Sequence, residues 1–273
     1  MDNQRGYYKA DFGEVGLIGK LALAKSARLK LNPFVSYSVV IRPFVEQGVF
    51  SVDDVRSRIE RNLERVRGRI TAAAERAGRD PALVRLVAVT KTVGVEEARI
   101  LVDLGVTDLG ENRVEGAREK IEAVGHGARW HMIGNVQRRK ARDVAALFDT
   151  VDSVDRVEVG EALALGCTEQ RRKLEVLLEV NVSGEASKHG FEPENVADAV
   201  RQMAQWRGLH VRGVMTMAPF VEDPEEVRPV FARLRRLAGE LGLAEVSMGM
   251  TNDFEVAVEE GATQVRIGTA LFQ

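Results

Sequence analysis

The fold class is decided by the stretch Leu86-Val87-Ala88-Val89-Thr90-Lys91-Thr92-Val93-Gly94, a short apolar run that ends in a hydroxyl and an amine. A run of this length with branched residues predicts a buried strand. No glycine-rich dinucleotide fingerprint follows it, which argues against a dinucleotide-binding domain. Seven more such runs follow, so the predicted strands are residues 86–89, 106–109, 130–133, 149–154, 174–182, 210–215, 245–248 and 264–267.

Amphipathic helical patterns separate these runs, and a long one precedes them. Strands that alternate with helices imply parallel pairing, and eight such units predict an α/β fold of the (β/α)8 TIM-barrel type. The eighth helix is missing at its usual place, and we expect the long first helix to cover that gap. The predicted helices are residues 52–77, 95–104, 113–124, 136–146, 155–168, 193–206, 225–241 and 253–260.

The composition is that of a soluble globular protein and excludes several classes. The chain has 273 residues, 45% hydrophobic and 29% charged, with a net charge of −2. This balance excludes a mainly disordered chain and gives no cationic field for nucleic acid. No apolar run is long enough to span a membrane. A single cysteine, Cys167, excludes an intrachain disulfide, the scattered histidines predict no metal site, and we expect a reducing cytoplasm.

Residues 1–50 differ from the rest of the chain in charge distribution and in the pattern of apolar residues. No acidic residue lies between Glu14 and Glu46, and the apolar residues there follow no clean helical or strand period. One interpretation is a targeting or membrane-surface segment. The interpretation we favour is a poorly ordered extension or a start codon assigned too far upstream. Residues 51–273 are then predicted to form one barrel domain.

The chemistry of a barrel enzyme lies at the carboxyl ends of its strands. Lys91 shares a strand face with Val87 and Val89, so it points into the barrel mouth if that face is internal. A desolvated lysine has a lowered pKa and is a nucleophile suited to Schiff-base formation. The alternative is a solvated lysine where the chain leaves the strand.

Two further strand ends predict an anion site. Residues 247–253 (SMGMTND) place a glycine, a hydroxyl and an Asn252–Glu255 capping pair before a helix. The alternative is a helix that is merely well capped. Arg266 alternates with Val265 and Ile267, so it faces the interior if that pair faces the helices. A buried guanidinium needs an anion or a ring nitrogen as partner, whereas the alternative is a surface arginine.

Two other features have an ordinary structural interpretation beside the functional one. His131 can act as a general acid or base, but a lone histidine in an apolar run is more often a core residue. The basic cluster at residues 138–142 is more simply a solvated helix face than a nucleic-acid site.

Taken together, the motifs resemble those of the pyridoxal phosphate homeostasis proteins, single-domain relatives of the alanine racemase N-terminal barrel. The resemblance covers roughly residues 51–272, in the right order. The matching segments are 87–92 (VAVTKT), 110–113 (GENR), 130–140 (WHMIGNVQRRK), 180–191 (VNVSGEASKHGF), 213–219 (GVMTMAP), 247–253 (SMGMTND) and 265–268 (VRIG).

The resemblance implies a fold-type III barrel that binds pyridoxal 5′-phosphate (PLP) as a Schiff base on Lys91. It implies phosphate contacts from Thr251, where relatives usually carry serine, and from Gly268 and Thr269. It implies that Arg266 faces the pyridine nitrogen. Further cofactor-binding residues implied by the resemblance are Asn112, His131, Met215 and Met250.

The resemblance also implies a role in regulating free PLP and amino-acid pools, with no established turnover. PLP, amino acids and PLP-dependent enzymes lacking their cofactor are the expected partners, and we expect a monomer or weak dimer. An arginine at the ring nitrogen keeps that nitrogen unprotonated, which weakens the ring as an electron sink. Racemases also take a catalytic tyrosine from a second domain, which we do not expect here because no sequence follows Gln273. The alternatives are a PLP-dependent amino-acid racemase or decarboxylase using Lys91, and a barrel for another phosphorylated metabolite.

Overall fold

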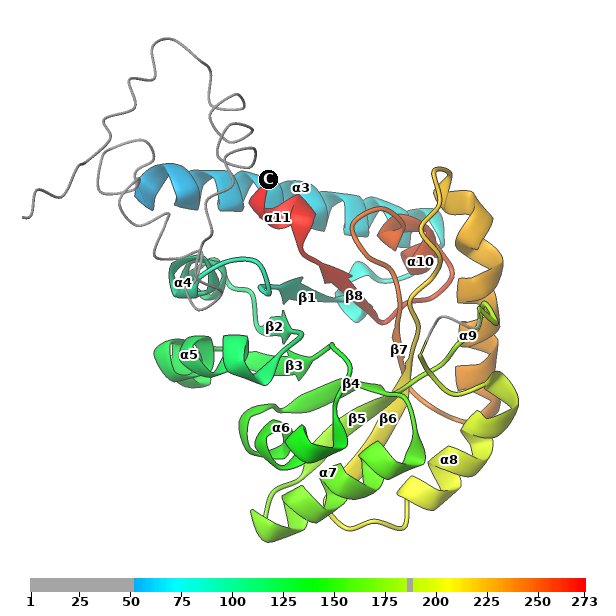
Figure 1. Cartoon of the computed structure of the whole chain (residues 1–273). Helices are drawn as coiled ribbons and strands as arrows, with labels where there is room; N and C mark the ends of the chain where they lie inside the picture. Colours follow the sequence, from blue (N-terminus) through cyan, green and yellow to red (C-terminus); the bar gives the residue numbers. More distant parts are fainter. Residues whose placement is uncertain (1–51, 186–188) are drawn as a thin grey trace, which may run out of the picture. The chain divides into compact units, whose positions relative to one another are not determined.

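Eight parallel strands close into a barrel in chain order in this computed structural model, which describes residues 52–185 and 189–273. The prediction of a (β/α)8 barrel is confirmed. Helices surround the ring of strands (Figure 1). The strands are β1 (Arg85–Val89), β2 (Asp108–Glu111), β3 (Arg129–Met132), β4 (Thr150–Val154), β5 (Leu174–Glu179), β6 (Leu209–Met215), β7 (Glu245–Ser247) and β8 (Gln264–Ile267).

The predicted helices all occur, with shorter bounds. Short 3-10 turns replace the predicted first turns of several of them, for example η3 (Arg138–Lys140) before α6 and η4 (Pro193–Asn195) before α8. Pro229 lies in the first turn of α9, where a missing N–H costs little. The helices are α3 (Val52–Arg76), α4 (Val95–Asp103), α5 (Val114–Val124), α6 (Ala141–Leu147), α7 (Val157–Glu169), α8 (Val196–Met203), α9 (Arg228–Glu240), α10 (Phe254–Glu259) and α11 (Thr269–Phe272).

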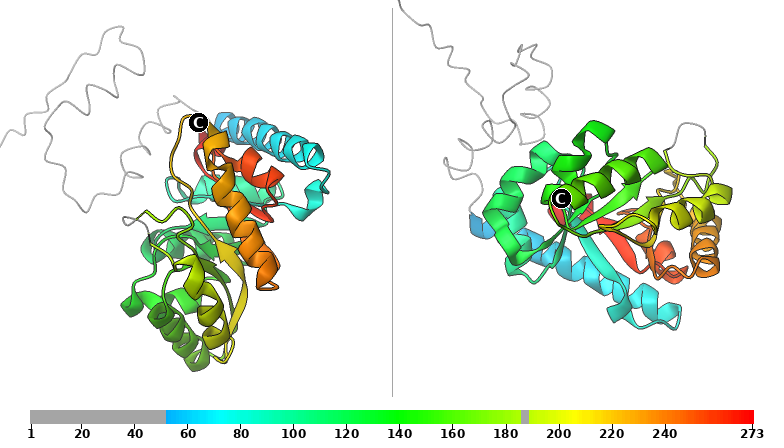
Figure 2. Two further views of the ribbon diagram at one scale, coloured as in Figure 1. Left: turned by 90° about the vertical axis from the view of Figure 1, so that its right-hand side faces the viewer. Right: turned by 90° about the horizontal axis from the view of Figure 1, so that it is seen from below.

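The long helix α3 covers the barrel where the eighth helix is reduced to one turn. It packs against α10 and α11, as expected, and two views show it lying along this side of the barrel (Figure 2). Its buried stripe includes Ile59, Leu63 and Val66. Asn62 donates hydrogen bonds to the carbonyl oxygens of Leu271, at 3.1 Å, and Gln273, at 2.8 Å. The last turn of the chain is therefore tied to the first helix.

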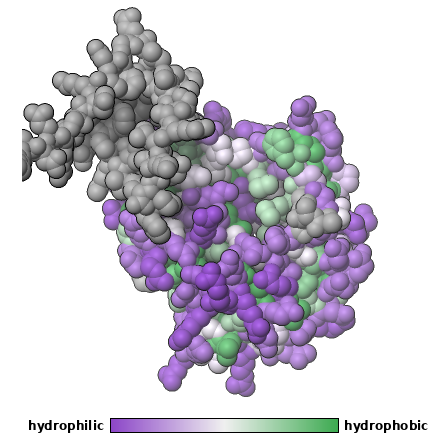
Figure 3. All heavy atoms as spheres, viewed as in Figure 1, coloured by the Kyte–Doolittle hydropathy of each residue, from purple (hydrophilic) through white to green (hydrophobic). Residues whose placement is uncertain are grey.

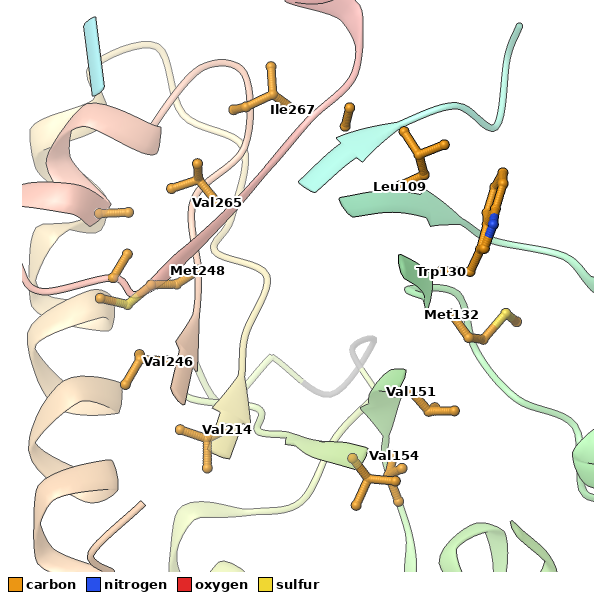
Figure 4. Close-up of a cluster of buried hydrophobic side chains, with 14 of the residues drawn as sticks. Leu109, Trp130, Met132, Val151, Val154, Val214, Val246, Met248, Val265 and Ile267 are labelled. Carbon is orange, nitrogen blue, oxygen red and sulfur yellow. The ribbon is translucent and has the colours of Figure 1, made fainter. Parts of the chain in front are cut away.

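Alternation along the strands separates an apolar outer layer from a polar interior. Side chains such as Trp130, Val151 and Val265 point outward from the strands into the layer beneath the helices (Figure 4). Their neighbours in sequence must then face inward. The inward set is largely polar and buried, and includes Asp108, His131, Asp152, Ser247, Gln264 and Arg266.

A ring of alternating charges closes the barrel at the amino ends of the strands, and we call it the floor ring. Glu245 accepts from Arg85 and Arg212, both at 3.4 Å, and Glu175 pairs with Arg129 and, at 3.9 Å, with Arg212. These side chains are only partly exposed, so the interior is separated from solvent at this end. The opposite end of the barrel is where a pocket opens.

The outer surface of the described part of the chain is mostly hydrophilic in the view of Figure 3, with scattered hydrophobic patches. Within residues 52–185 and 189–273, no helix combines the length and the apolar character needed to cross a membrane. The interpretations of residues 1–50 as a targeting segment or an extension lie outside the described residues.

Candidate functional site

A cavity of about 580 Å³ opens at the carboxyl ends of the strands. Its size lies in the range usual for cofactor and small-molecule sites. Residues from seven of the eight strands or the segments that follow them line it, from the end of β1 to the start of α11. Seven of the residues that the sequence singled out are brought together in its wall: Lys91, Asn112, Met250, Thr251, Arg266, Gly268 and Thr269.

Lys91 lies at the edge of this pocket, two residues beyond the end of β1. Its inward strand face is confirmed, because Val87 on the same face lies opposite the inward Arg266 in the ladder. Of the two interpretations, the solvated lysine is the one that holds, since Lys91 is exposed. The reason is that β1 ends at Val89, so the lysine projects past the strand into the open mouth.

A buried ion pair fixes the main chain directly before Lys91. The Lys120 ammonium donates to the Thr90 carbonyl oxygen at 2.6 Å and to Glu111 Oε1 at 2.5 Å. The Thr90 hydroxyl donates to the same Glu111 oxygen at 2.7 Å. Thr90 precedes Lys91 and Glu111 precedes Asn112, so this cluster positions two pocket residues at once. Lys120 was not predicted as a functional residue, because nothing in the sequence of a helix shows that one of its lysines is buried.

The loop after β7 forms the side of the pocket nearest β8. Gly249 has φ +93°, and a Cβ there would lie 2.6 Å from the Cβ of Ala257, so only glycine fits this turn. The predicted cap of α10 is wrong: Asp253 is the N-cap, and its carboxylate accepts from the Met250 N–H at 2.6 Å. Glu255 pairs with Arg69 on α3, 2.7 Å away, instead of capping.

Several main-chain N–H groups at this side have no acceptor among the described residues. They belong to Thr251, Asn252, Gly268 and Thr269, all of which line the pocket. Unpaired N–H groups at the start of a helix are donors that require water or a ligand. With the Thr251 hydroxyl they form a set of donors suited to a phosphate or another oxyanion.

Arg266 faces inward and is 5% exposed, as predicted from alternation. It donates to Ser247 Oγ at 2.5 Å and to the Thr216 carbonyl oxygen at 2.9 Å. Burial lowers the pKa of Arg266, and the carboxylates of Asp152 and Glu179 oppose this effect. A guanidinium has five N–H donors, so some remain to contact a ligand in the pocket.

His131 and Met215 were expected to line the pocket, but neither lies in its wall. β3 continues to Met132 and β6 to Met215, so the pocket wall starts beyond them, at Ile133 and Met217. Met215 is fully buried, and His131 is 1% exposed. The interpretation of His131 as a satisfied core residue is the one that holds.

His131 lies in a buried polar chain below Arg266. Its ring nitrogens lie 2.9 Å from Asp108 and 3.2 Å from Asp152. Burial alone lowers the pKa of His131, but the two carboxylates more than offset this and raise it to about 9. The imidazole is therefore a cation at neutral pH. Gln264 continues the chain by donating to Asp152 at 2.5 Å and to Ser247 Oγ at 3.0 Å.

The pocket also contains a carboxyl group that was not predicted from the sequence. Glu179 is the last residue of β5, is 4% exposed and lines the pocket. Burial and the nearby carboxylate of Asp155 raise the pKa of Glu179 to about 7, while Arg266 and His189 oppose the rise. A glutamate within an otherwise largely apolar run was the available signal.

Two other predictions concern charges and metals. The basic cluster is a surface feature: Lys140 pairs with Glu115 at 2.6 Å and Arg138 approaches Glu161 at 4.0 Å. Within the described ranges, no group of three or more histidine, cysteine or acidic side chains could hold a metal ion.

Comparisons with known proteins agree with this geometry. The family model "Alanine racemase, N-terminal domain" matches residues 58–273. A pyridoxal phosphate homeostasis protein of Aquifex aeolicus is 41% identical over 217 residues, covering 77% of this chain and 95% of its own. One from Pseudomonas aeruginosa is 42% identical, covering 79% and 95%. PipY of Synechococcus elongatus, solved with PLP bound, superposes with a TM-score of 0.69 at 31% identity, covering 79% of this chain and all (100%) of that one.

Proposed function

Because this chain belongs to the family of pyridoxal phosphate homeostasis proteins, we propose that it binds PLP in the pocket at the carboxyl ends of its strands. We propose further that Lys91 holds the cofactor as a Schiff base. Its amine and the cofactor's aldehyde carbon form a C=N bond, and water leaves. The observation that carries the proposal is the presence, in one pocket, of an accessible amine and a set of unpaired main-chain donors.

The residues present fit the cofactor's functional groups. The N–H groups of Thr251, Gly268 and Thr269, with the Thr251 hydroxyl, would hold the phosphate. The methyl that threonine adds over serine leaves the hydroxyl available. Arg266 would donate a hydrogen bond to the pyridine nitrogen. Asn112 and Met250 would contact the ring from either side of the mouth.

The same arrangement favours a carrier over a catalyst. When bound, PLP supplies an electron sink, and that sink is strongest when its ring nitrogen is protonated. Arg266 cannot give up a proton at neutral pH and is fixed by Ser247 and Thr216, so it leaves the ring nitrogen unprotonated. The proposed role is therefore regulation of free PLP and of amino-acid pools in the cytoplasm. PLP-dependent enzymes lacking cofactor are the proposed recipients, and the proposed state is a monomer or weak dimer.

The first experiment is an absorption spectrum of the purified protein with and without added PLP, followed by borohydride reduction and peptide mapping. We expect a near-visible band and an adduct on Lys91. Lys91→Ala should lose the band and the adduct, whereas Lys173→Ala, which removes another exposed lysine, should keep both. A wild-type protein that stays colourless with added PLP would contradict the proposal.

A second measurement separates a carrier from an enzyme. The loaded protein is incubated with D- and L-amino acids, and racemised and decarboxylated products are quantified. We expect no product above that formed by free PLP. Turnover that disappears in Lys91→Ala would favour a racemase or decarboxylase instead.

A further inference from the structure

A carboxyl group without a partner lies across the barrel mouth from Lys91. The eight strands follow one another around the ring, so β5, which ends at Glu179, is opposite β1, which leads to Lys91. Both residues line the same pocket. We propose that Glu179 receives the ammonium group of a small primary amine, α-amino acids included, and takes one proton from it. This inference rests on the proposed function, because the amine needs an aldehyde carbon held at Lys91 as its target.

The environment of Glu179 leaves its carboxyl group open to a ligand. The residue is 4% exposed, and no described residue donates a hydrogen bond to its side chain. Its neighbour Asp155 is already satisfied by Asn135 at 2.8 Å and by Arg156 at 2.7 Å. A buried carboxylate that lacks donors is unfavourable, so a ligand that brings an N–H group gains free energy there.

The charged groups that face Glu179 come from several elements. Asp155 follows β4 and Arg266 lies on β8, while His189 belongs to the loop that follows β5. His189 is 3.8 Å from Asp155, and its side chain is 68% exposed. Burial and Asp155 outweigh the two cations and bring the pKa of Glu179 to about 7. A group that is half ionised near neutral pH is well suited to accept and return a proton.

The chemistry of amines explains why a proton acceptor is needed here. A primary amine has a pKa of roughly 8 to 10 and is mostly protonated at pH 7, so its nitrogen has no free electron pair. Transfer of one proton gives a neutral amine and a carboxylic acid at Glu179. The freed pair would then attack the carbon that is double-bonded to the Lys91 nitrogen; a C=N bond to the entering nitrogen forms and the C=N bond to Lys91 breaks. Two hydrogens of the entering nitrogen end on Lys91, which leaves as a free amine.

The test compares Glu179→Gln with wild type, after both are loaded with PLP. Ethylamine or glycine is added at a series of pH values, and release of Lys91 is followed by absorbance and by borohydride trapping with intact mass measurement. Glu64→Gln, an exposed change on α3, is the matched control. At pH 7 we expect Glu179→Gln to react at least about 100-fold more slowly.

The pH profile distinguishes a proton acceptor from a structural residue. For ethylamine, the wild-type rate should rise to about pH 7 and then level off, because Glu179 is ionised above that pH. In Glu179→Gln the rate should keep rising about tenfold per pH unit with the concentration of free amine. Glu179→Asp should recover part of the rate. If Glu179→Gln slows the reaction of both ethylamine and glycine, the site recognises the amino group alone. If it slows only the reaction of glycine, the site recognises α-amino acids.

A measurement without the cofactor gives an independent readout. In apo protein labelled with ¹³C at glutamate carboxyl carbons, one resonance absent from Glu179→Gln should titrate near pH 7, and ethylammonium chloride should lower its midpoint. Identical amine profiles for wild type and Glu179→Gln, with PLP normally fixed on Lys91, would overturn this inference alone. Failure of wild type to acquire PLP on Lys91 would instead overturn the proposed function.

Discussion

Breaking the Lys120–Glu111 ion pair from one side should strongly destabilise the barrel. The two side chains are 8% and 2% exposed, and the ammonium also donates to the Thr90 carbonyl oxygen. Lys120→Met keeps the apolar stem but leaves the Glu111 carboxyl group buried, with the Thr90 hydroxyl as its remaining donor. The carboxylate loses its charge partner and cannot regain water.

The expected loss in the free energy of unfolding follows from the burial of both charged groups. Removing one partner of a buried ion pair costs about 3–5 kcal/mol. In a domain of this size each kcal/mol lowers Tm by roughly 2–4 °C, so Tm should fall by about 6–20 °C. Lys120→Met/Glu111→Gln removes both charges and should recover most of the loss, because no unpaired charge then stays buried.

The assay is urea unfolding followed by circular dichroism, with the free energy of unfolding extrapolated to water. Lys140→Met is the control: its ammonium lies 2.6 Å from Glu115, but the side chains are 32% and 67% exposed, so it should cost less than about 1 kcal/mol. The reasoning is refuted if Lys120→Met costs no more than Lys140→Met. It is also refuted if the double variant is as unstable as Lys120→Met.

Three further predictions concern other parts of the barrel. The pKa of His131 rises from 6.5 to about 9 on folding, so the stability that protonated His131 contributes is fully present below pH 6.5 and should be lost between pH 6.5 and 9. A Tm that stays constant over this interval would contradict this prediction. Asn62→Ala should cost about 1–3 kcal/mol because it frees the carbonyl oxygens of Leu271 and Gln273 from α3, as urea unfolding can measure. Gly249→Ala should destabilise the fold and weaken PLP binding, because the added Cβ would contact Ala257. Gly242→Ala, at φ +66° with open space around it, should cost only the backbone strain. Equal losses of stability in calorimetry and of affinity in PLP titration would show that the contact with Ala257 is unimportant.

The sequence predicted the order of elements because each strand and helix has its own periodicity. The predicted ends of the strands were less accurate where a run of apolar residues continues beyond the last residue that is paired in the sheet. The fifth strand was predicted to reach residue 182, but it ends at Glu179, since Val180 forms only an isolated bridge with Phe191. The second strand was predicted two residues too early, because Gly110 and Glu111 are not apolar yet belong to it.

The site was predicted well where alternation fixes the direction of a side chain. Arg266 is the clearest case, because Val265 and Ile267 on either side are apolar and fully buried. Depth along the barrel axis is a different quantity, and it depends on the stagger of neighbouring strands. His131 and Met215 therefore face the barrel interior, as predicted, but they lie deeper along the barrel axis than the residues of the pocket wall. Pairings that join distant elements, such as Lys120 with Glu111, leave no local pattern in the sequence.

The floor ring determines where a molecule can enter or leave the barrel interior. Buried side chains, including His131, Asp152 and Gln264, fill the interior between the ring and the pocket. In the described part of the chain, a molecule held in the pocket therefore reaches solvent at the carboxyl ends of the strands, and not through the floor ring. If a recipient enzyme takes PLP directly, as proposed above, we expect it to contact this rim, where Phe220 lines the pocket and is 83% exposed.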